Sequence, residues 1–304
     1  METTTIEVEK GPAGQPTVAD VTRTRLWQAC GLVSLVALVL VYHGVFQWWW
    51  GEWWKEESEY SHGILIPFMS AFVIWFNHKR IAKMPVTPDR WGLALLLPAI
   101  LLQVIAHRGG VVSVAGLTFP VALTGMSLML LGKRATAALL FPILFLYFMI
   151  VPPTSYLQKL SFQIQMLSTT GAAWGLKHVG LNVVQSGKSI VFAESGQVVT
   201  VAAACSGFRL LIALLSFGTF LAYMKSGPVW GKLTLVALVI PLSVALNSLR
   251  VFGTALVGEY WGQDAMHAFH DPAGYIMVGI ALVVVFFPLS KVVKCRDFKS
   301  MPVS

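Results

Sequence analysis

The chain has 304 residues, of which 56% are hydrophobic and only 12% are charged. Soluble domains carry about 25% charged residues, so this composition excludes an ordinary soluble protein and predicts an integral membrane protein in a lipid bilayer. The formal net charge of +8 does not indicate a nucleic-acid-binding protein, because most basic residues lie in short segments between apolar runs.

The apolar runs predict an all-α protein with about eight membrane-spanning helices, since a helix needs roughly 20 mostly apolar residues to cross a bilayer. Residues 1–25 lack an apolar run and are expected to be a flexible cytoplasmic tail without a cleavable signal peptide. Residues 26–290 then form one multi-pass membrane domain, and residues 291–304 form a basic cytoplasmic tail. We place the spans at residues 26–46, 62–77, 91–107, 111–131, 135–151, 203–224, 233–257 and 273–290.

The distribution of basic residues predicts the orientation of these spans. With the N-terminus in the cytoplasm, the inner segments hold all but seven of the 22 Lys and Arg residues, which is a positive-inside pattern. Both termini are therefore expected in the cytoplasm. Five tryptophans at 48–50 and 53–54 are typical of an interfacial belt. The seven remaining basic residues are Lys55, Arg108, Lys159, Lys177, Lys188, Arg209 and Arg250.

The longest stretch between spans, residues 152–202, is expected on the outer side. Residues 155–179 mix apolar residues with Gln and Lys, which predicts a helix in the outer interface; the alternative is a ninth, poorly apolar span. Two β-branched runs at 188–193 and 197–201 flank a Gly-containing turn and predict a β-hairpin. The hairpin must lie outside the hydrocarbon, because an open sheet edge cannot face lipid.

Cys205 follows this hairpin, in Ala204-Cys205-Ser206-Gly207-Phe208-Arg209, where the sixth span begins on the outer side. A thiol in the first turn of a helix lies at the positive end of the helix dipole, which favours its ionised form. Arg209 is one turn later on the same face, about 6 Å deeper. We therefore predict that Cys205 is a nucleophile; the alternative is an inert core cysteine beside an interfacial arginine.

Arg250 and Asn247 lie one turn apart in the outer half of the seventh span. An arginine near the centre of a membrane helix costs roughly 2.5–3.5 kcal/mol, so it needs a partner or a wet cavity. Its predicted role is to hold a substrate carbonyl or to stabilise an oxyanion. The alternative is that Arg250 extends to the outer headgroups.

His270 precedes the eighth span and has the chemistry of a proton-transfer group, with His267 as the rival base. His62 stands at the outer start of the second span, where it lines the same site or is a helix-start residue capped by Ser61. These histidines lack a short metal-ligand spacing, so neither a metal nor another cofactor is expected.

The other two cysteines, Cys30 and Cys295, are expected to be inert. Cys30 lies in the first span near its inner end, and Cys295 lies in the cytoplasmic tail. Because neither is on the side of Cys205, we predict no disulfide.

These motifs, in this order, resemble those of the exosortases and archaeosortases. The segments 204–209 and 247–250 are similar to the family's Cys-Ser-Gly and Asn-x-x-Arg segments, and His270 is similar to its histidine before the last span. Tyr60-Ser61-His62-Gly63 resembles an N-terminal family feature. The resemblance covers residues from about 45 to 290, nearly the whole membrane part.

The resemblance implies a transpeptidase of the bacterial inner membrane with its active site facing the periplasm. Its partners would be exported proteins with a C-terminal sorting signal of the Pro-Glu-Pro type, often made alongside exopolysaccharide. It implies that Cys205 forms a thioester, that Arg250 stabilises negative charge and that His270 transfers protons, with Arg209, Asn247 and His62 in support. The rival functions are a plain membrane cysteine protease, an anion transporter and an assembly factor for polysaccharide export.

Overall fold

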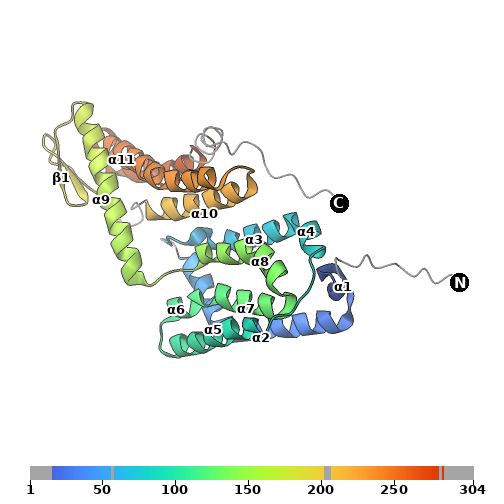
Figure 1. Ribbon diagram of the computed structural model, residues 1–304. Helices are drawn as coiled ribbons and strands as arrows, with labels where there is room; N and C mark the ends of the chain where they lie inside the picture. Colours follow the sequence, from blue (N-terminus) through green and yellow to red (C-terminus); the bar gives the residue numbers. More distant parts are fainter. Residues whose placement is uncertain (1–15, 56–57, 202–206, 281–282, 284–304) are drawn as a thin grey trace. The chain divides into compact units, whose positions relative to one another are not determined.

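The computed structural model describes residues 16–55, 58–201, 207–280 and 283 (Figure 1). These residues are mostly helical and include one small antiparallel sheet, as the sequence predicts. The chain divides into two compact units, which we describe separately. Among the described residues, the first unit comprises 16–54 and 62–153, and the second comprises 55, 58–61, 154–201, 207–280 and 283.

The first unit is entirely helical in the part that the structure describes. Its apolar helices coincide with the first five predicted spans, because long apolar runs favour helices whatever surrounds them. The elements are α1 (Val18–Arg23), α2 (Arg25–Trp53), η1 (Ser61–Ile64), α3 (Leu65–Phe76), α4 (His78–Ala82), α5 (Trp91–Arg108), α6 (Val112–Leu117), α7 (Phe119–Leu131), α8 (Lys133–Phe145) and η2 (Leu146–Met149).

Two features of this unit differ from the sequence expectations. Part of the expected N-terminal tail forms helix α1, which has a Thr17–Asp20 capping box and buries Val18 and Val21 against Ile81 and Val86. The predicted first span ends at residue 46, but α2 continues for two more turns to Trp53. Most of the tryptophans expected in the interfacial belt therefore lie in this helix. Trp49 is fully buried there, while Trp50 and Trp54 are exposed as an interfacial belt requires.

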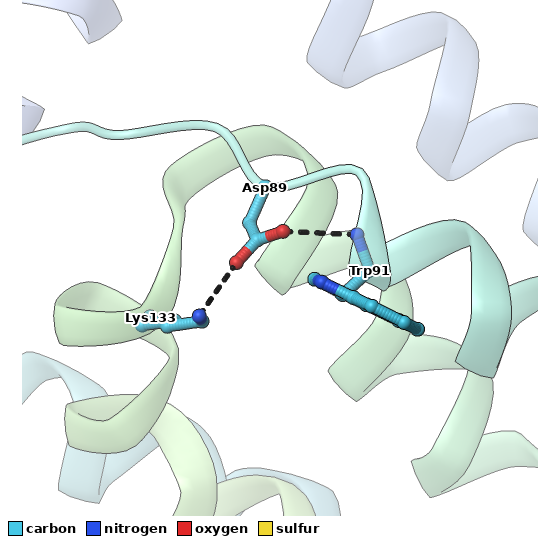
Figure 2. Close-up of polar contacts among 3 residues, drawn as sticks. All are labelled: Asp89, Trp91 and Lys133. Atoms are coloured by element: carbon cyan, nitrogen blue, oxygen red, sulfur yellow. Dashed lines mark hydrogen bonds and ion pairs between the residues drawn. The ribbon is translucent and has the colours of Figure 1, made fainter.

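A polar cluster fixes the start of α5 (Figure 2). The backbone N–H of Trp91 donates to Oδ1 of Asp89 at 2.9 Å, and Nζ of Lys133 lies 3.2 Å from Oδ2. The hydrogen bond from Trp91, followed by the contact with Lys133, lowers the pKa of Asp89 below its ordinary value. Asp89 therefore joins the first turns of α5 and α8.

The second unit contains helix α9 (Thr154–His178), helix α10 (Phe208–Met224), helix α11 (Val229–Ile280) and the sheet. The sheet has the order β1-β2-β3, formed by β1 (Val183–Ser186), β2 (Ser189–Phe192) and β3 (Val198–Thr200). The predicted hairpin is confirmed, because β2 and β3 pair antiparallel with Ile190 opposite Val199. Strand β1 was not predicted, since its four residues carry only two β-branched side chains.

The core of this unit joins the sheet to α9 and α11. Its fully buried members include Leu176 of α9, Ile190 of β2 and Ala255 of α11. Helices α9 and α11 pack with the same chain direction, because Gly171 meets Ser248 and, one turn later in both helices, Gly175 meets Phe252. A second cluster packs α10 against α11 through Leu214 and Leu235.

Helix α11 is two helices joined at Gly262, whose φ of 85° and ψ of 178° are not helical. Residues 229–261 form its first arm and residues 263–280 its second. An added Cβ on Gly258 would lie 3.1 Å from Sδ of Met266, and one on Gly253 would lie 3.3 Å from the Phe269 ring. The arms therefore fold back on each other as a helical hairpin. This corrects the expectation of a loop between residues 257 and 273.

Four helices of the described part are long and apolar enough to cross a membrane, which makes this a membrane protein. A fifth is added if the helices on both sides of residues 150–153 form one broken span, and two further apolar helices, Ser61–Phe76 and Phe208–Met224, are shorter. The eight-span count and the orientation stay predictions. The four helices are Arg25–Trp53, Trp91–Arg108, Val112–Leu131 and Val229–Met266.

Candidate active site

The predicted nucleophile Cys205 lies outside the described residues, which end at Val201 and resume at Gly207. Both of these flanking residues are held by buried polar side chains. On the first side, Nε2 of Gln165 in α9 donates a hydrogen bond to the backbone carbonyl of Val201. Gln165 is only 4% exposed, so this bond fixes the end of β3 within the core of the unit.

On the other side, Gly207 begins α10 with a left-handed φ of 82°. The side chain of Asn247 lies directly against it: an added Cβ on Gly207 would lie 2.7 Å from Cγ and Nδ2 of Asn247. Asn247 is fully buried. Glycine is therefore required here for two reasons, the backbone conformation and the close approach of an amide.

Arg209 lies in the first turn of α10, which begins at Phe208. The sequence predicts Cys205 in that first turn and Arg209 one turn deeper, so the later start of the helix corrects this expectation. The Nε and Nη2 atoms of Arg209 are buried and have no hydrogen-bond partner among the residues that the structure describes. A guanidinium in this state tends to hold an anion, a carbonyl oxygen or water, because burial without a partner is costly.

The stretch before η1 also belongs to this unit and lies beside the start of α10. Oγ of Ser161 in α9 donates to Oε1 of Glu59 at 2.8 Å. The rings of Tyr60 and Phe208 lie 6.4 Å apart between centroids. The Tyr60 end of the N-terminal sequence feature therefore packs on the helix that follows Cys205.

Arg250 lies on the first arm of α11, three residues after Asn247 and so on a neighbouring part of the same face. Its guanidinium packs on the backbone of Gly274 in the second arm, where an added Cβ would lie 3.3 Å from Cζ and Nη2. Arg250 therefore points into the helical hairpin. This geometry does not match the alternative of an arginine that extends to lipid headgroups.

His270 belongs to the second arm of α11, whose helix begins before the predicted eighth span. Its backbone position is one turn before Gly274, the residue on which Arg250 packs. His267, the rival base, is on the same arm. The side chains of both histidines lie outside what the structure describes. His62 lies in η1 and belongs to the first unit, so the structure does not bring it together with the other predicted residues.

The structure thus brings Asn247 to the residue two positions after Cys205, and Arg250 to the arm that carries His270. Sequence reasoning missed Gln165 and Gly274. Gln165 lies in a helix whose Gln and Lys residues indicated exposure at an interface rather than burial. The contact of Gly274 with Arg250 follows only from the packing of the two arms of α11 against each other.

The model of one protein family, described as Transmembrane exosortase (Exosortase_EpsH), matches residues 53–287. The chain belongs to the transmembrane exosortase family. The match covers both flanks of Cys205, the Asn247–Arg250 segment and the His270 arm, which all belong to the second unit. No curated protein and no solved structure matches significantly.

Proposed function

We propose that this exosortase is a cysteine transpeptidase that cleaves C-terminal sorting signals of exported proteins. The observation that carries the proposal is the paired placement described above, with Asn247 against Gly207 and Arg250 against Gly274. Covalent geometry limits the Cα of Cys205 to about 7 Å from that of Gly207, two residues later. A nucleophile, a guanidinium and an imidazole then belong to neighbouring parts of one unit.

In the first step, the thiolate of Cys205 attacks the scissile carbonyl and forms a tetrahedral intermediate. The intermediate collapses to a thioester, the C–N bond breaks, and the amine of the sorting signal leaves with a proton. In the second step, an amine, a glycan hydroxyl or water attacks the thioester and releases the thiol. The position of Cys205 just before α10 supports the thiolate, because the N-terminus of a helix favours negative charge.

Arg250 and His270 are assigned to the charge and proton movements of these steps. Arg250 stabilises the negative charge that develops on the carbonyl oxygen, for which a fixed guanidinium is suited. His270 accepts the thiol proton and delivers it to the leaving amine. The buried nitrogen atoms of Arg209 support a second carbonyl or oxyanion contact near the thiolate. Asn247 is a supporting residue, whereas the supporting role of His62 stays an expectation from the sequence, because His62 belongs to the first unit.

The proposed partners are exported proteins with a sorting signal of the Pro-Glu-Pro type, and the proposed location is the bacterial inner membrane with the site facing the periplasm. The positive-inside distribution of Lys and Arg supports this orientation, because it puts the start of α10 and the hairpin of α11 on the non-cytoplasmic side.

The test is intact-mass analysis of an exported protein with such a signal, co-expressed with the wild-type chain or with Cys205→Ala. We expect cleavage only with the wild type, and the matched variant Cys30→Ala should cleave normally because Cys30 lies exposed on α2. Hydroxylamine should divert the thioester to a hydroxamate of predictable mass. The mass of the natural product separates transpeptidation from hydrolysis, and normal cleavage by a membrane-inserted Cys205→Ala chain would exclude the proposal.

A further inference from the structure

Arg209 carries two unused hydrogen-bond donors close to the proposed nucleophile. It lies in the first turn of α10, and its Nε and Nη2 atoms are buried without a hydrogen-bond partner among the described residues. A guanidinium stays charged at physiological pH and has no acceptor atom, so its buried N–H groups need acceptor oxygens. The charge and the two donors together favour an anionic partner.

The carboxylates that the structure describes in the same unit do not supply this partner. Glu59 and Glu259 each accept a hydrogen bond from a serine of the unit, while Glu194 and Asp264 are exposed. None of these four side chains pairs with the buried nitrogen atoms of Arg209. Within the described part of the chain, the two donors are therefore left for a bound molecule.

The two buried nitrogen atoms indicate the shape of the acceptor. Nε and Nη2 lie on the same edge of the planar guanidinium, so their N–H bonds point in the same direction. A carboxylate binds such an edge through both of its oxygens in two parallel hydrogen bonds, whereas a single carbonyl oxygen or oxyanion leaves one donor poorly satisfied. The N-terminus of α10, whose N-cap residue Gly207 has no side chain, adds to the attraction for negative charge. The geometry therefore favours a carboxylate.

Covalent geometry limits where this carboxylate lies on a substrate. The Cα atoms of Cys205 and Arg209 are four residues apart in the chain and therefore at most about 14 Å apart in space. An extended peptide advances about 3.3 Å per residue. A peptide that meets both groups thus carries its carboxylate within a few residues of the bond that Cys205 attacks.

We infer that Arg209 binds a carboxylate side chain of the substrate close to the scissile bond and thereby selects sorting signals that are acidic at this position. The inference rests on the proposed function and adds a specificity-determining residue to it. Arg250 then acts on the carbonyl oxygen of the scissile bond, while Arg209 binds a side chain that is not altered by the reaction.

Binding is measured on the full chain with Cys205→Ala in detergent, so that cleavage does not interfere. The probes are a fluorescently labelled sorting signal with a Pro-Glu-Pro segment and the same signal with Pro-Gln-Pro. We expect the Kd of the second signal to be about 10- to 100-fold higher, the effect of losing a charge-assisted hydrogen-bond pair. This comparison does not depend on the folding of any Arg209 variant. Equal affinities, or no binding of either signal, would overturn the inference.

Variants of Arg209 then locate the discrimination. With Arg209→Gln, the two signals should bind with nearly equal affinity, because the charge and the parallel donors are both lost. Arg209→Lys keeps the charge without the paired donors, so it should restore only part of the discrimination. Lys159→Gln, which removes an exposed cation of α9, is the matched control and should keep the discrimination in full. Full discrimination by Arg209→Gln or Arg209→Lys would contradict binding through the Nε–Nη2 edge.

The results separate this inference from the proposed function. Cleavage by the Cys205→Ala chain would exclude the proposed chemistry, while the affinities of the two signals would still decide whether Arg209 binds a carboxylate. If Cys205→Ala is inactive and both signals bind equally, the function stands and the inference fails. If both signals bind equally and Arg209→Gln instead weakens binding of phosphatidylglycerol, the bound anion is a lipid headgroup and the inference is wrong.

Discussion

Two physical reasons favour a glycine at position 207, and replacing Gly207 with alanine should lower the free energy of unfolding through both of them. The first is the left-handed φ of 82°, which costs a residue with a Cβ about 1–2 kcal/mol. The second is contact, because the new Cβ would lie 2.7 Å from the side chain of Asn247. Asn247 is fully buried, so its side chain cannot move aside into solvent. Forcing extra volume into such a site costs about 1–3 kcal/mol more.

Gly196 provides a matched control in the turn between β2 and β3. Its φ of 68° is also left-handed, but an added Cβ meets nothing within 4 Å. Gly196→Ala should therefore lose only the backbone term of about 1–2 kcal/mol. Gly207→Ala should lose a total of about 2–5 kcal/mol in the free energy of unfolding.

The measurement is denaturant or SDS unfolding of both variants in the same detergent, followed by tryptophan fluorescence. Equal losses in the two variants would show that Asn247 does not confine Gly207, and the reasoning about the second flank of Cys205 would be wrong. A larger loss in Gly207→Ala, with the chain still inserted in the membrane, would locate the constraint in the contact between α10 and α11.

Three further predictions follow from the contacts described. Gln165→Leu should lower the free energy of unfolding by about 1–3 kcal/mol and reduce cleavage, because the carbonyl of Val201 loses its hydrogen-bond donor. Gln163→Leu, on the exposed face of α9, should change neither the stability nor the cleavage rate. Gly274→Ala should displace the Arg250 guanidinium and lower cleavage roughly 10-fold without a large loss of stability, while Gly279→Ala, where a Cβ meets nothing, should be silent. The pKa of Asp89 is lowered from 3.8 by folding, so its ionised form stabilises the protein above pH 3.8, and this stabilisation is lost as the pH falls through the lowered pKa. The melting temperatures of wild type and Asp89→Asn should therefore differ modestly at pH 7 and converge in acid below pH 3.8. A difference that persists in acid would contradict the last prediction.

Helix positions were predictable from the sequence because the apolar runs are long and carry their own signal. The exceptions have local causes. Residues 258–272 contain Gly, Asp, His and Pro, which indicated a loop, yet only Gly262 departs from helical geometry and Pro272 lies inside the second arm. Tertiary packing of the two arms outweighs the weak propensity of these residues. The same argument explains α1, whose short amphipathic run is stabilised by contacts with Ile81 and Val86.

The residues of the candidate site could be proposed from their types and order in the sequence, but their contacts could not be predicted. Sequence spacing puts Asn247 and Arg250 on one side of a helix without saying which neighbour they meet. The answer depends on two glycines, Gly207 and Gly274, whose missing side chains make room for an amide and a guanidinium. Such complementarity between distant residues leaves no periodic signal in a single sequence.

The sheet also bears on the depth of Arg250, the residue with the largest cost of burial in a membrane. The turn between β2 and β3 meets the tip of the hairpin, where Oγ of Ser195 donates to Glu259 at 2.8 Å. Because a sheet with open edges is excluded from the hydrocarbon, we expect this tip at or beyond the membrane surface. Arg250 lies nine residues before Glu259, about 13 Å along the helix. This distance is the greatest depth that we expect for Arg250 in a hydrocarbon core of roughly 30 Å, and a charged residue below the surface of that core is costly. We expect the cost of its charge to be offset inside the protein by polar groups of the proposed substrate-binding site, while Gly274 leaves room for the guanidinium.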